Sequence, residues 1–484
     1  MRIIQDSEDI LAKLLSSISS EENNETLQIL RRIEDAGFKA YLVGGYIRDI
    51  ILDRKLDKRF DNIDIDIATD AHPEDILNIF NKVIPTGIKH GTVTVIGLKN
   101  KYEITTFRVD EQYYDLRHPE KVQYVSDIHQ DLSRRDFTIN ALAFNPFTKE
   151  LIDDFGGIDD IKRRIIRTVG DAESRFKEDA LRMLRAIRFS TNLMFEIEEE
   201  TLRQIKKKSE LLLNISKERI RDEFNRLLMS DKPSFGIELL RITNVLNYMV
   251  PDLAKCYGEY QNDFHLHDVY YHLLYSCDAA PKNIILRLAA LFHDIGKPIS
   301  LNEFRTKGIK ENVFYNHEVY SEQIVKDFLT NYKYSRYEIN TISKLVRYHM
   351  FHYTPNWTDG AVRRFVAKVG EDLLPMLFSL RVADRIGNGK NFGYPKILIE
   401  FWDKIQQIIS ENHALKITDL SIDGNDIMQR YNLKPSKLIG KILNQLLEYV
   451  LDDNSLNSRE KLFELADMVY EKIKKEVFTS SVEE

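Results

Sequence analysis

The spacing of apolar positions changes from strand-like to helix-like along the chain. Residues 1–37 carry apolar positions at helical spacing and are predicted to form a helix. Between residues 38 and 145, strands are predicted from the short runs AYLVGG, NIDIDIAT, GTVTVIGL, YEITTF and TINALAF. After about Ile158 strand patterns almost vanish, and the remaining sequence is helical in pattern. The pattern predicts an α+β protein that is mostly helical, with a small mixed sheet and helices in its N-terminal part.

The clearest alternation runs from Ile63 to Ile67, where isoleucine and aspartate take turns. Successive side chains of a strand face opposite ways, so Asp64 and Asp66 are expected on one face and the isoleucines behind them. Two neighbouring carboxylates repel unless a cation lies between them, and Mg²⁺ binds through carboxylates and substrate phosphates. The pair is therefore a candidate metal site for phosphoryl or nucleotidyl transfer. The alternative is a half-buried strand that shows its charges to water.

Composition narrows the class of protein. The length of 484 residues exceeds what one core usually supports, so about two to four domains are expected. Two cysteines argue against a disulfide framework and against a cysteine-based zinc site. The sequence has no run of about 18 apolar residues and no signal-peptide pattern, which predicts a cytoplasmic protein without a membrane span.

Charge changes this picture only locally. The net charge of −7 argues mildly against indiscriminate nucleic-acid binding. Residues 161–167 and 203–208 form basic clusters. The first could meet a phosphate backbone, whereas the second is interpreted as a solvated helix face.

Gly44 and Gly45 separate the apolar run Ala40–Val43 from a helical pattern. A strand, a glycine turn and a helix start leave backbone N–H groups available to phosphate oxygens. Arg48, one turn into the helix, could add a bidentate contact to a triphosphate. An ordinary tight turn is the alternative.

Three further stretches carry candidate site residues. Glu103, in a predicted strand, is a candidate third carboxylate. The segment Arg134–Ala141 begins with two arginines, of which Arg135 suits a triphosphate, while Asp136 could accept from a ribose hydroxyl. A surface Arg–Asp network is the alternative for this segment.

The third stretch, Glu178–Phe189, is treated as one helix at 100° per residue. Apolar positions then share one face, and Asp179, Arg182 and Arg185 fall on the opposite arc, with Arg188 at the border. Cytosine and adenine present an amino donor beside an unprotonated ring nitrogen, which a carboxylate and a guanidinium can pair. Uracil and guanine have the opposite polarity and would leave buried groups unpaired. Asp179 and Arg182 could therefore select CTP and ATP, unless they form only a surface salt bridge.

In order and separation, these motifs resemble those of class II tRNA nucleotidyltransferases, the CCA-adding members of the tRNA nucleotidyltransferase/poly(A) polymerase family. The resemblance covers about residues 38–230 and rests on Leu42–Asp49, Asp64–Thr69, Arg134–Ala141, Gly156-Gly157 with Asp159, Glu178–Phe189 and Ser216–Leu228. It implies a polymerase-beta-like head followed by all-helical neck, body and tail domains. The expected boundaries are an N-terminal helix at 1–37, the head at 38–160, a neck and body at 161–260, a further module at 261–391 and a tail at 392–484.

The resemblance also implies roles for the candidate residues. Asp64 and Asp66 would bind Mg²⁺, and Glu103 would join them. Nucleotide contacts would come from Gly44, Gly45, Arg48, Arg135, Asp136, Asp179, Arg182, Arg185 and Arg188. The implied reaction adds C, C and A to the 3′ end of tRNA from CTP and ATP and releases pyrophosphate, with no obligate protein partner. Residues 111–127 stand where the family has a mobile loop linked to the change from C to A, which favours full CCA addition. Poly(A) polymerase and enzymes that add only A or only CC are the alternatives.

The module at 261–391 resembles an HD domain, centred on Leu288–Lys297 (LAALFHDIGK). The implied ligands of a divalent metal are His272, His293, Asp294 and Asp384, with His317 and His349 as extra candidates. Such a site would activate water for phosphoester hydrolysis. A fold that has lost its metal is one alternative. A protein that acts chiefly as a phosphohydrolase is another. His265 and His352 are interpreted as structural or surface groups.

Overall fold

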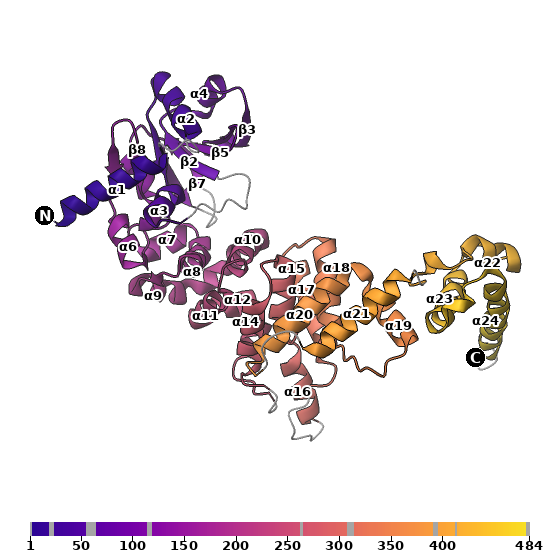
Figure 1. Ribbon diagram of the computed structural model, residues 1–484. Coiled ribbons are helices and arrows are strands. Elements are labelled where there is room, and N and C mark those ends of the chain that lie inside the picture. Colours follow the sequence, from indigo (N-terminus) through magenta and orange to yellow (C-terminus); the bar gives the residue numbers. More distant parts are fainter. Residues whose placement is uncertain are drawn as a thin grey trace. The chain divides into compact units, whose positions relative to one another are not determined.

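The computed structural model describes residues 2–18, 24–54, 64–113, 119–261, 265–306, 314–390, 395–411 and 414–480 (Figure 1). Its internal contacts divide the chain into two compact units, residues 1–254 and 255–484. The finer domain boundaries expected from the sequence stay predictions. Among the described residues, no helix combines the length and the apolar character that crossing a membrane requires.

The N-terminal unit begins with two helices, α1 (Arg2–Ile18) and α2 (Asn24–Asp35). Both lie within the helical region expected at residues 1–37, and residues 19–23 lie outside the described part of the chain. Each helix still buries its own apolar stripe, with Leu14 in α1 and Leu30 in α2 fully buried.

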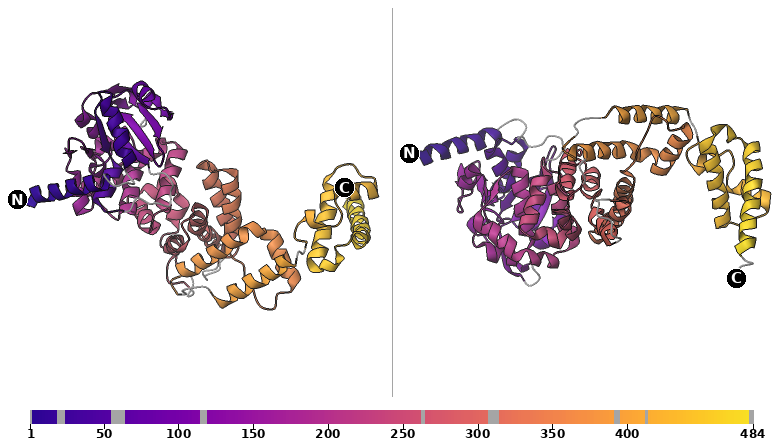
Figure 2. Two further views of the ribbon diagram at one scale, coloured as in Figure 1. Left: turned by 45° about the horizontal axis from the view of Figure 1, so that its top comes forward. Right: turned by 90° about the horizontal axis from the view of Figure 1, so that it is seen from below.

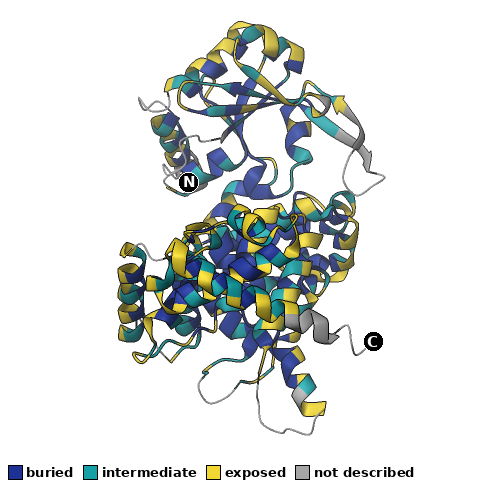
Figure 3. Cartoon of the chain, turned by 90° about the vertical axis from the view of Figure 1, so that its right-hand side faces the viewer, coloured by how far each residue is buried: buried dark blue, intermediate teal, exposed yellow. Residues whose placement is uncertain are grey.

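A mixed seven-stranded sheet forms the centre of this unit, as predicted (Figure 2). In order across the sheet, its strands are β3 (Val83–Gly87), β4 (Thr92–Ile96), β5 (Lys101–Thr106), β2 (Asp64–Thr69), β1 (Ala40–Val43), β8 (Ala143–Asn145) and β9 (Glu150–Ile152). Only β2 and β5 pair in parallel within this sheet; the other described pairs are antiparallel. Ile65, Ile67 and Ile104 are buried in it. Figure 3 colours the chain by burial, with buried residues in dark blue.

The predicted strand TINALAF is mostly not a strand. Thr138–Asn140 form a 3₁₀ turn, η2, and only Ala143–Asn145 enter the sheet. The polar side chains of this turn have local partners: Thr138 donates to Asp160, and the amide of Asn140 contacts Arg48 and Asp136. These side-chain hydrogen bonds compete with strand pairing.

A separate antiparallel pair, β6 (Arg108–Tyr113) and β7 (Pro119–Tyr124), follows β5 directly. It had no counterpart among the predicted strands. The predicted mobile loop at 111–127 overlaps this pair, and its residues 114–118 lie outside the described part of the chain. The consequence for C-to-A switching stays a prediction.

Helices surround and follow the sheet in the N-terminal unit. They are α3 (Gly45–Ile51), α4 (Pro73–Ile79), α5 (Ile128–Ser133), α6 (Gly157–Arg163), α7 (Ala172–Glu178), α8 (Leu181–Leu193), α9 (Glu199–Lys208), α10 (Lys217–Leu228), α11 (Pro233–Ile242) and α12 (Val245–Met249). A pair of two-residue strands, β10 (Ile165–Ile166) and β11 (Glu196–Ile197), is all the sheet described after residue 158. α8 packs against α10 and α11.

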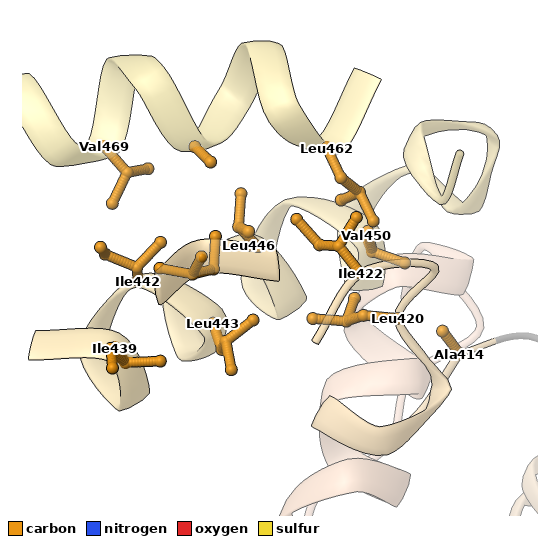
Figure 4. Close-up of a cluster of buried hydrophobic side chains, with 12 residues drawn as sticks. Ala414, Leu420, Ile422, Ile439, Ile442, Leu443, Leu446, Val450, Leu462 and Val469 are labelled. Atoms are coloured by element: carbon orange, nitrogen blue, oxygen red, sulfur yellow. The ribbon is translucent and has the colours of Figure 1, made fainter. Parts of the chain in front are cut away.

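The second unit is helical in its described residues. After α13 (Pro251–Lys255), which spans the division between the units, it contains α14 (Val269–Ala279), α15 (Ile284–Phe292), α16 (Lys297–Thr306), α17 (His317–Asn331), α18 (Arg336–Tyr348), α19 (Asp359–Val369), α20 (Leu374–Gly387), α21 (Lys396–Ser410), α22 (Gly424–Tyr431), α23 (Lys437–Asp452) and α24 (Arg459–Ser480). α14 packs against both α15 and α20. Near the C-terminus, Ile442, Leu446 and Leu462 belong to a separate apolar cluster formed with α22, α23 and α24 (Figure 4).

Candidate functional site

A polar cleft of about 420 Å³ lies in the N-terminal unit, between the sheet and the segments around α7, α8 and α10. Its lining is Val43, Asp66, Ile67, Thr92, Glu103, Thr105, Arg108, Arg134, Arg135, Asp136, Asp179, Leu181, Arg182, Arg185 and Arg219. Residues from three sequence-predicted clusters thus meet in one place. Arginines outnumber carboxylates in this lining, which suits an anionic ligand.

The acidic side of the cleft comes from adjacent strands. Asp66 in β2 and Glu103 in β5 are register partners of a parallel pair, so both carboxylates lie at the same level of the sheet. Asp64 begins β2 in register with Lys101, and its side chain lies outside the described part of the structure. The isoleucines that flank Asp66 are completely buried, as the alternation predicts.

Gly44 lies between the acidic and basic groups. Its backbone has φ +72°, and a Cβ built on it would lie 3.2 Å from both Oδ2 of Asp66 and Nη1 of Arg135. A side chain at this position would therefore be strained and would press on both groups. The absence of a side chain lets the chain pass close to both.

The two adjacent arginines are held by a carboxylate that the sequence interpretation missed. Asp131, the fourth residue of α5, is completely buried and accepts from Arg134 at 2.7 and 2.9 Å and from Arg135 at 3.2 Å. Burial raises the pKa of this carboxyl, but the two guanidinium charges outweigh that effect and keep the pKa below its usual range. Asp131 also accepts from the backbone N–H of Arg108 at 3.4 Å. Its position one helical turn before the arginines is the signal that could have revealed it.

Asp136 is engaged by protein groups on both oxygens. Arg185 donates to Oδ2 at 2.6 and 2.8 Å, while the amide of Asn140 and the backbone N–H of Phe137 donate to Oδ1. Burial raises its pKa, but the Arg185 charge and the hydrogen bonds outweigh that effect and lower the pKa to about 2. The ionised carboxylate therefore holds Arg185 at the cleft. The sequence predicted a different contact for Asp136, to a ribose hydroxyl.

The predicted continuous helix from Glu178 to Phe189 was wrong at its start. α7 ends at Glu178, Asp179 takes extended backbone angles, and α8 begins at Leu181. Asp179 and Arg182 both line the cleft, and the ion pairs described for them are with Arg219 and Glu178 rather than with each other, so the alternative of a simple surface salt bridge is not supported. Among the described residues, the Asp179 carboxylate pairs instead with Arg219 at 2.7 Å.

Arg48, Arg188 and Gly45 are not among the residues that line the cleft. The buried Arg48 guanidinium donates to Oδ1 of Asn140 at 2.6 Å and packs under Gly45, whose Cβ position is 3.3 Å from it. Arg188 is buried against Glu223 at 2.6 Å. In this arrangement Arg48 and Arg188 bind side chains of the protein, Asn140 and Glu223, and lie outside the cleft lining. Conversely, the sequence interpretation did not select Thr92, Thr105, Arg108 or Arg219, which line the cleft.

A second polar cluster lies in the second unit and contains every residue of the predicted HD set. Nε2 of His272 is 3.0 Å from Nε2 of His293, and both nitrogens lie 3.3–3.5 Å from oxygens of Asp294 and Asp384. α14 and α20 approach closely here, because Gly387 in α20 has no Cβ; a Cβ at that position would clash with Ser276 in α14. That approach sets Asp384 against His272.

His317 and His349 complete a second group on the other oxygen of Asp294. Their Nε2 atoms lie 2.9 and 3.3 Å from Oδ1, whereas His272 and His293 face Oδ2. His293, His317 and His349 each place Nδ1 2.6–2.8 Å from a backbone carbonyl, an arrangement that leaves Nε2 as the lone-pair donor. Burial lowers the pKa of His349 to about 4, which favours the neutral ring that metals bind.

The donor set suits divalent cations and is flanked by two positive side chains. Two groups of three ligand atoms, His272–His293–Asp294 and Asp294–His317–His349, are each compact enough to hold one ion. Lys297 and Arg381 lie 2.5 and 2.7 Å from Asp294 and Asp384. His265 is half-buried, with its ring centre 5.5 Å from that of His272, and His352 is exposed.

Comparisons with known proteins identify the family of the chain. Residues 40–167 match the family model "Poly A polymerase head domain", residues 194–257 match "Probable RNA and SrmB- binding site of polymerase A", and residues 313–466 match "tRNA nucleotidyltransferase domain 2 putative". The CCA-adding enzyme of Ligilactobacillus salivarius is 34% identical over 459 residues, which cover 93% of this chain and 98% of that protein. The enzyme of Leuconostoc mesenteroides is 33% identical over 90% of this chain and 94% of its own length.

Among solved structures, the Bacillus stearothermophilus CCA-adding enzyme in complex with CTP matches with a TM-score of 0.68. It is 27% identical, and the match covers 94% of this chain and all of that one. Identity of a third or more that extends over nearly the whole of both chains decides the family. The chain belongs to the CCA-adding enzymes, a family of nucleotidyltransferases.

Proposed function

We propose that this chain adds C, C and A to the 3′ end of tRNA, using CTP and ATP and releasing pyrophosphate. The observation that carries the proposal is the single cleft in which acidic, triphosphate-binding and base-reading candidates meet. tRNA, CTP and ATP are the proposed substrates, and no protein partner is required. The proposed place of action is the cytoplasm, where these substrates occur together.

Mg²⁺ is the proposed metal of this cleft. The residues present fit it: Asp66 and Glu103 supply oxygen ligands at one level of the sheet, and Asp64 stands two residues earlier in the same strand. Bound there, the ion would neutralise charge on the triphosphate. Triphosphate binding and base recognition are proposed for the side chains. Arg134 and Arg135, fixed by Asp131, are proposed to hold the triphosphate, and Asp179 and Arg182 to pair with the base.

The product formed on a tRNA that lacks its 3′ end tests the proposal. CTP alone is expected to give two added C residues, and CTP with ATP is expected to give the complete end. A long ladder with ATP alone would identify a poly(A) polymerase instead. Addition of A only after CC, or a stop after CC, would identify one of the two partial activities. The near full-length similarity to CCA-adding enzymes favours the complete reaction.

A second activity, metal-dependent phosphoester hydrolysis, is proposed for the cluster around Asp294. It is supported by six candidate ligand side chains from five segments, which lie in α14, at the end of α15, in α17, at the end of α18 and in α20, and which converge within one buried site. Asp64→Ala and Asp294→Ala, made separately, test the assignment of activities to sites. The first is expected to abolish nucleotide addition and to leave hydrolysis of a generic phosphodiester unchanged, and the second is expected to do the reverse. Loss of both activities in either variant would contradict two independent sites.

A further inference from the structure

Asp179 lies outside the two helices that flank it. Its backbone is extended (φ −142°, ψ 104°), between the end of α7 and the start of α8. In that position helix packing does not fix the direction of its carboxylate. Two donors do so instead: the N–H of Leu181 lies 3.0 Å from Oδ1, and Nη2 of Arg219 lies 2.7 Å from Oδ2.

Arg219 comes from a different element, the first turn of α10. Its side chain lines the cleft and is 25% exposed. Asp179 is its ion-pair partner, and its Nη1 atom is buried without a hydrogen-bond partner among the described residues. The guanidinium is therefore committed to Asp179 rather than to a second protein acceptor.

Arg182 is held by other groups. Nη1 donates to Glu178 at 2.6 Å and to the carbonyl of Arg175 at 3.3 Å, and Nη2 donates to the carbonyl of Arg134 at 3.2 Å. Asp179 and Arg182 are only three residues apart and carry opposite charges. Because each has its own partner, they do not neutralise each other.

We propose that Arg219 is a positioning residue for nucleotide selection, which acts by holding the Asp179 carboxylate toward the amino group of cytosine or adenine. The inference rests on the proposed nucleotidyl transfer in the same cleft. Without Arg219 the carboxylate can turn to Arg182, and an Asp179–Arg182 pair would consume the acceptor and the donor that the base requires. The same turn would remove the repulsion between this carboxylate and the carbonyl oxygen of uracil or guanine at that position.

Arg219→Gln and Arg219→Lys test this role through two measurements with Mg²⁺ present. One is equilibrium binding of CTP, ATP, UTP and GTP, and the other is single-nucleotide addition to tRNA that lacks its 3′ end. Arg219→Gln is expected to weaken binding of CTP and ATP about tenfold or more, as loss of a charged hydrogen bond implies. UTP and GTP binding should change less, so the preference for CTP and ATP falls. The KM for CTP should rise more than kcat falls, and Arg219→Lys should restore part of the preference.

Arg221→Gln is the matched control, because Arg221 lies on the same helix, pairs with Asp222 at 2.9 Å and does not line the cleft. It should leave all four affinities unchanged, and thermal unfolding should show that each variant is folded. An equal loss of affinity for all four nucleotides in Arg219→Gln, or an unchanged preference, would overturn the positioning role. Wild-type protein that prefers CTP and ATP in binding but never extends tRNA would overturn the proposed function alone.

Discussion

Both Nε and Nη2 of Arg185, in α8, donate to one oxygen of Asp136, at 2.8 and 2.6 Å, just before the turn η2. The pair links the turn that follows the two cleft arginines to the helix that carries Arg182. It therefore joins the phosphate side of the cleft to the base side.

Asp136→Asn should destabilise the protein by about 1–3 kcal/mol near pH 7, because Arg185 loses its nearest carboxylate partner and keeps Glu223 at 3.7 Å. The pKa of Asp136 is lowered to about 2 in the folded state, so the ionised carboxylate contributes stability above its ordinary pKa of 3.8. That contribution is lost as the pH falls from about 4 toward 2. Unfolding midpoints of wild type and variant, measured over this range, should converge at the acid end. A constant difference at every pH would contradict the ion-pair explanation.

Gly44→Ala should impair nucleotide addition strongly, because the new Cβ would lie 3.2 Å from both Asp66 and Arg135. Gly37→Ala is its control: this glycine also has positive φ, at +92°, but a Cβ there meets nothing within 4 Å. Both variants should lose about 1 kcal/mol of stability from backbone strain. Addition rates should fall only in Gly44→Ala. Equal rates in the two variants would show that the contact with Asp66 and Arg135 does not matter.

Asp131→Asn should raise the KM for CTP and ATP together and reduce stability by about 3 kcal/mol or more, because a completely buried carboxylate holds two guanidiniums. The preference among the four nucleotides should not change, since Asp131 does not contact Asp179 or Arg182. Steady-state kinetics with each nucleotide separate this pattern from that of Arg219→Gln. A changed base preference would count against the separate roles.

Glu103→Gln should reduce the rate of nucleotide addition, because Glu103 is the register partner of Asp66 in the adjacent strand. Glu74→Gln, on the exposed surface of α4, serves as the control and should behave as wild type. Titration with Mg²⁺ should show a weaker apparent metal affinity for Glu103→Gln. An unchanged Mg²⁺ dependence would remove Glu103 from the proposed metal site.

Metal analysis checks the cluster in the second unit. Asp294 offers one oxygen to each of two groups of histidines, so Asp294→Ala should lose bound divalent metal from both. His349→Ala should lose at most the metal of the second group. Bound Mn²⁺ per chain, measured after gel filtration, distinguishes the two variants. Equal metal content in wild type and Asp294→Ala would contradict the site.

The sequence by itself determined the mixed sheet and the buried isoleucines around Asp66. These features follow from local periods and short motifs, because a strand period of two and a helix period of 3.6 fix which side chains share a face. Asp66, Glu103, Arg135, Asp179 and Arg182 were candidates from the sequence, and all of them line the cleft.

Only the tertiary structure decided which partner each charged group takes. Arg48 and Arg188 fit the motif pattern equally well, yet each is buried against a neighbour from a distant segment, Asn140 or Glu223. The Asp179 carboxylate likewise pairs with Arg219, forty residues later in the sequence. A buried charge takes whichever partner the packing brings within hydrogen-bond distance, and no local period carries that information.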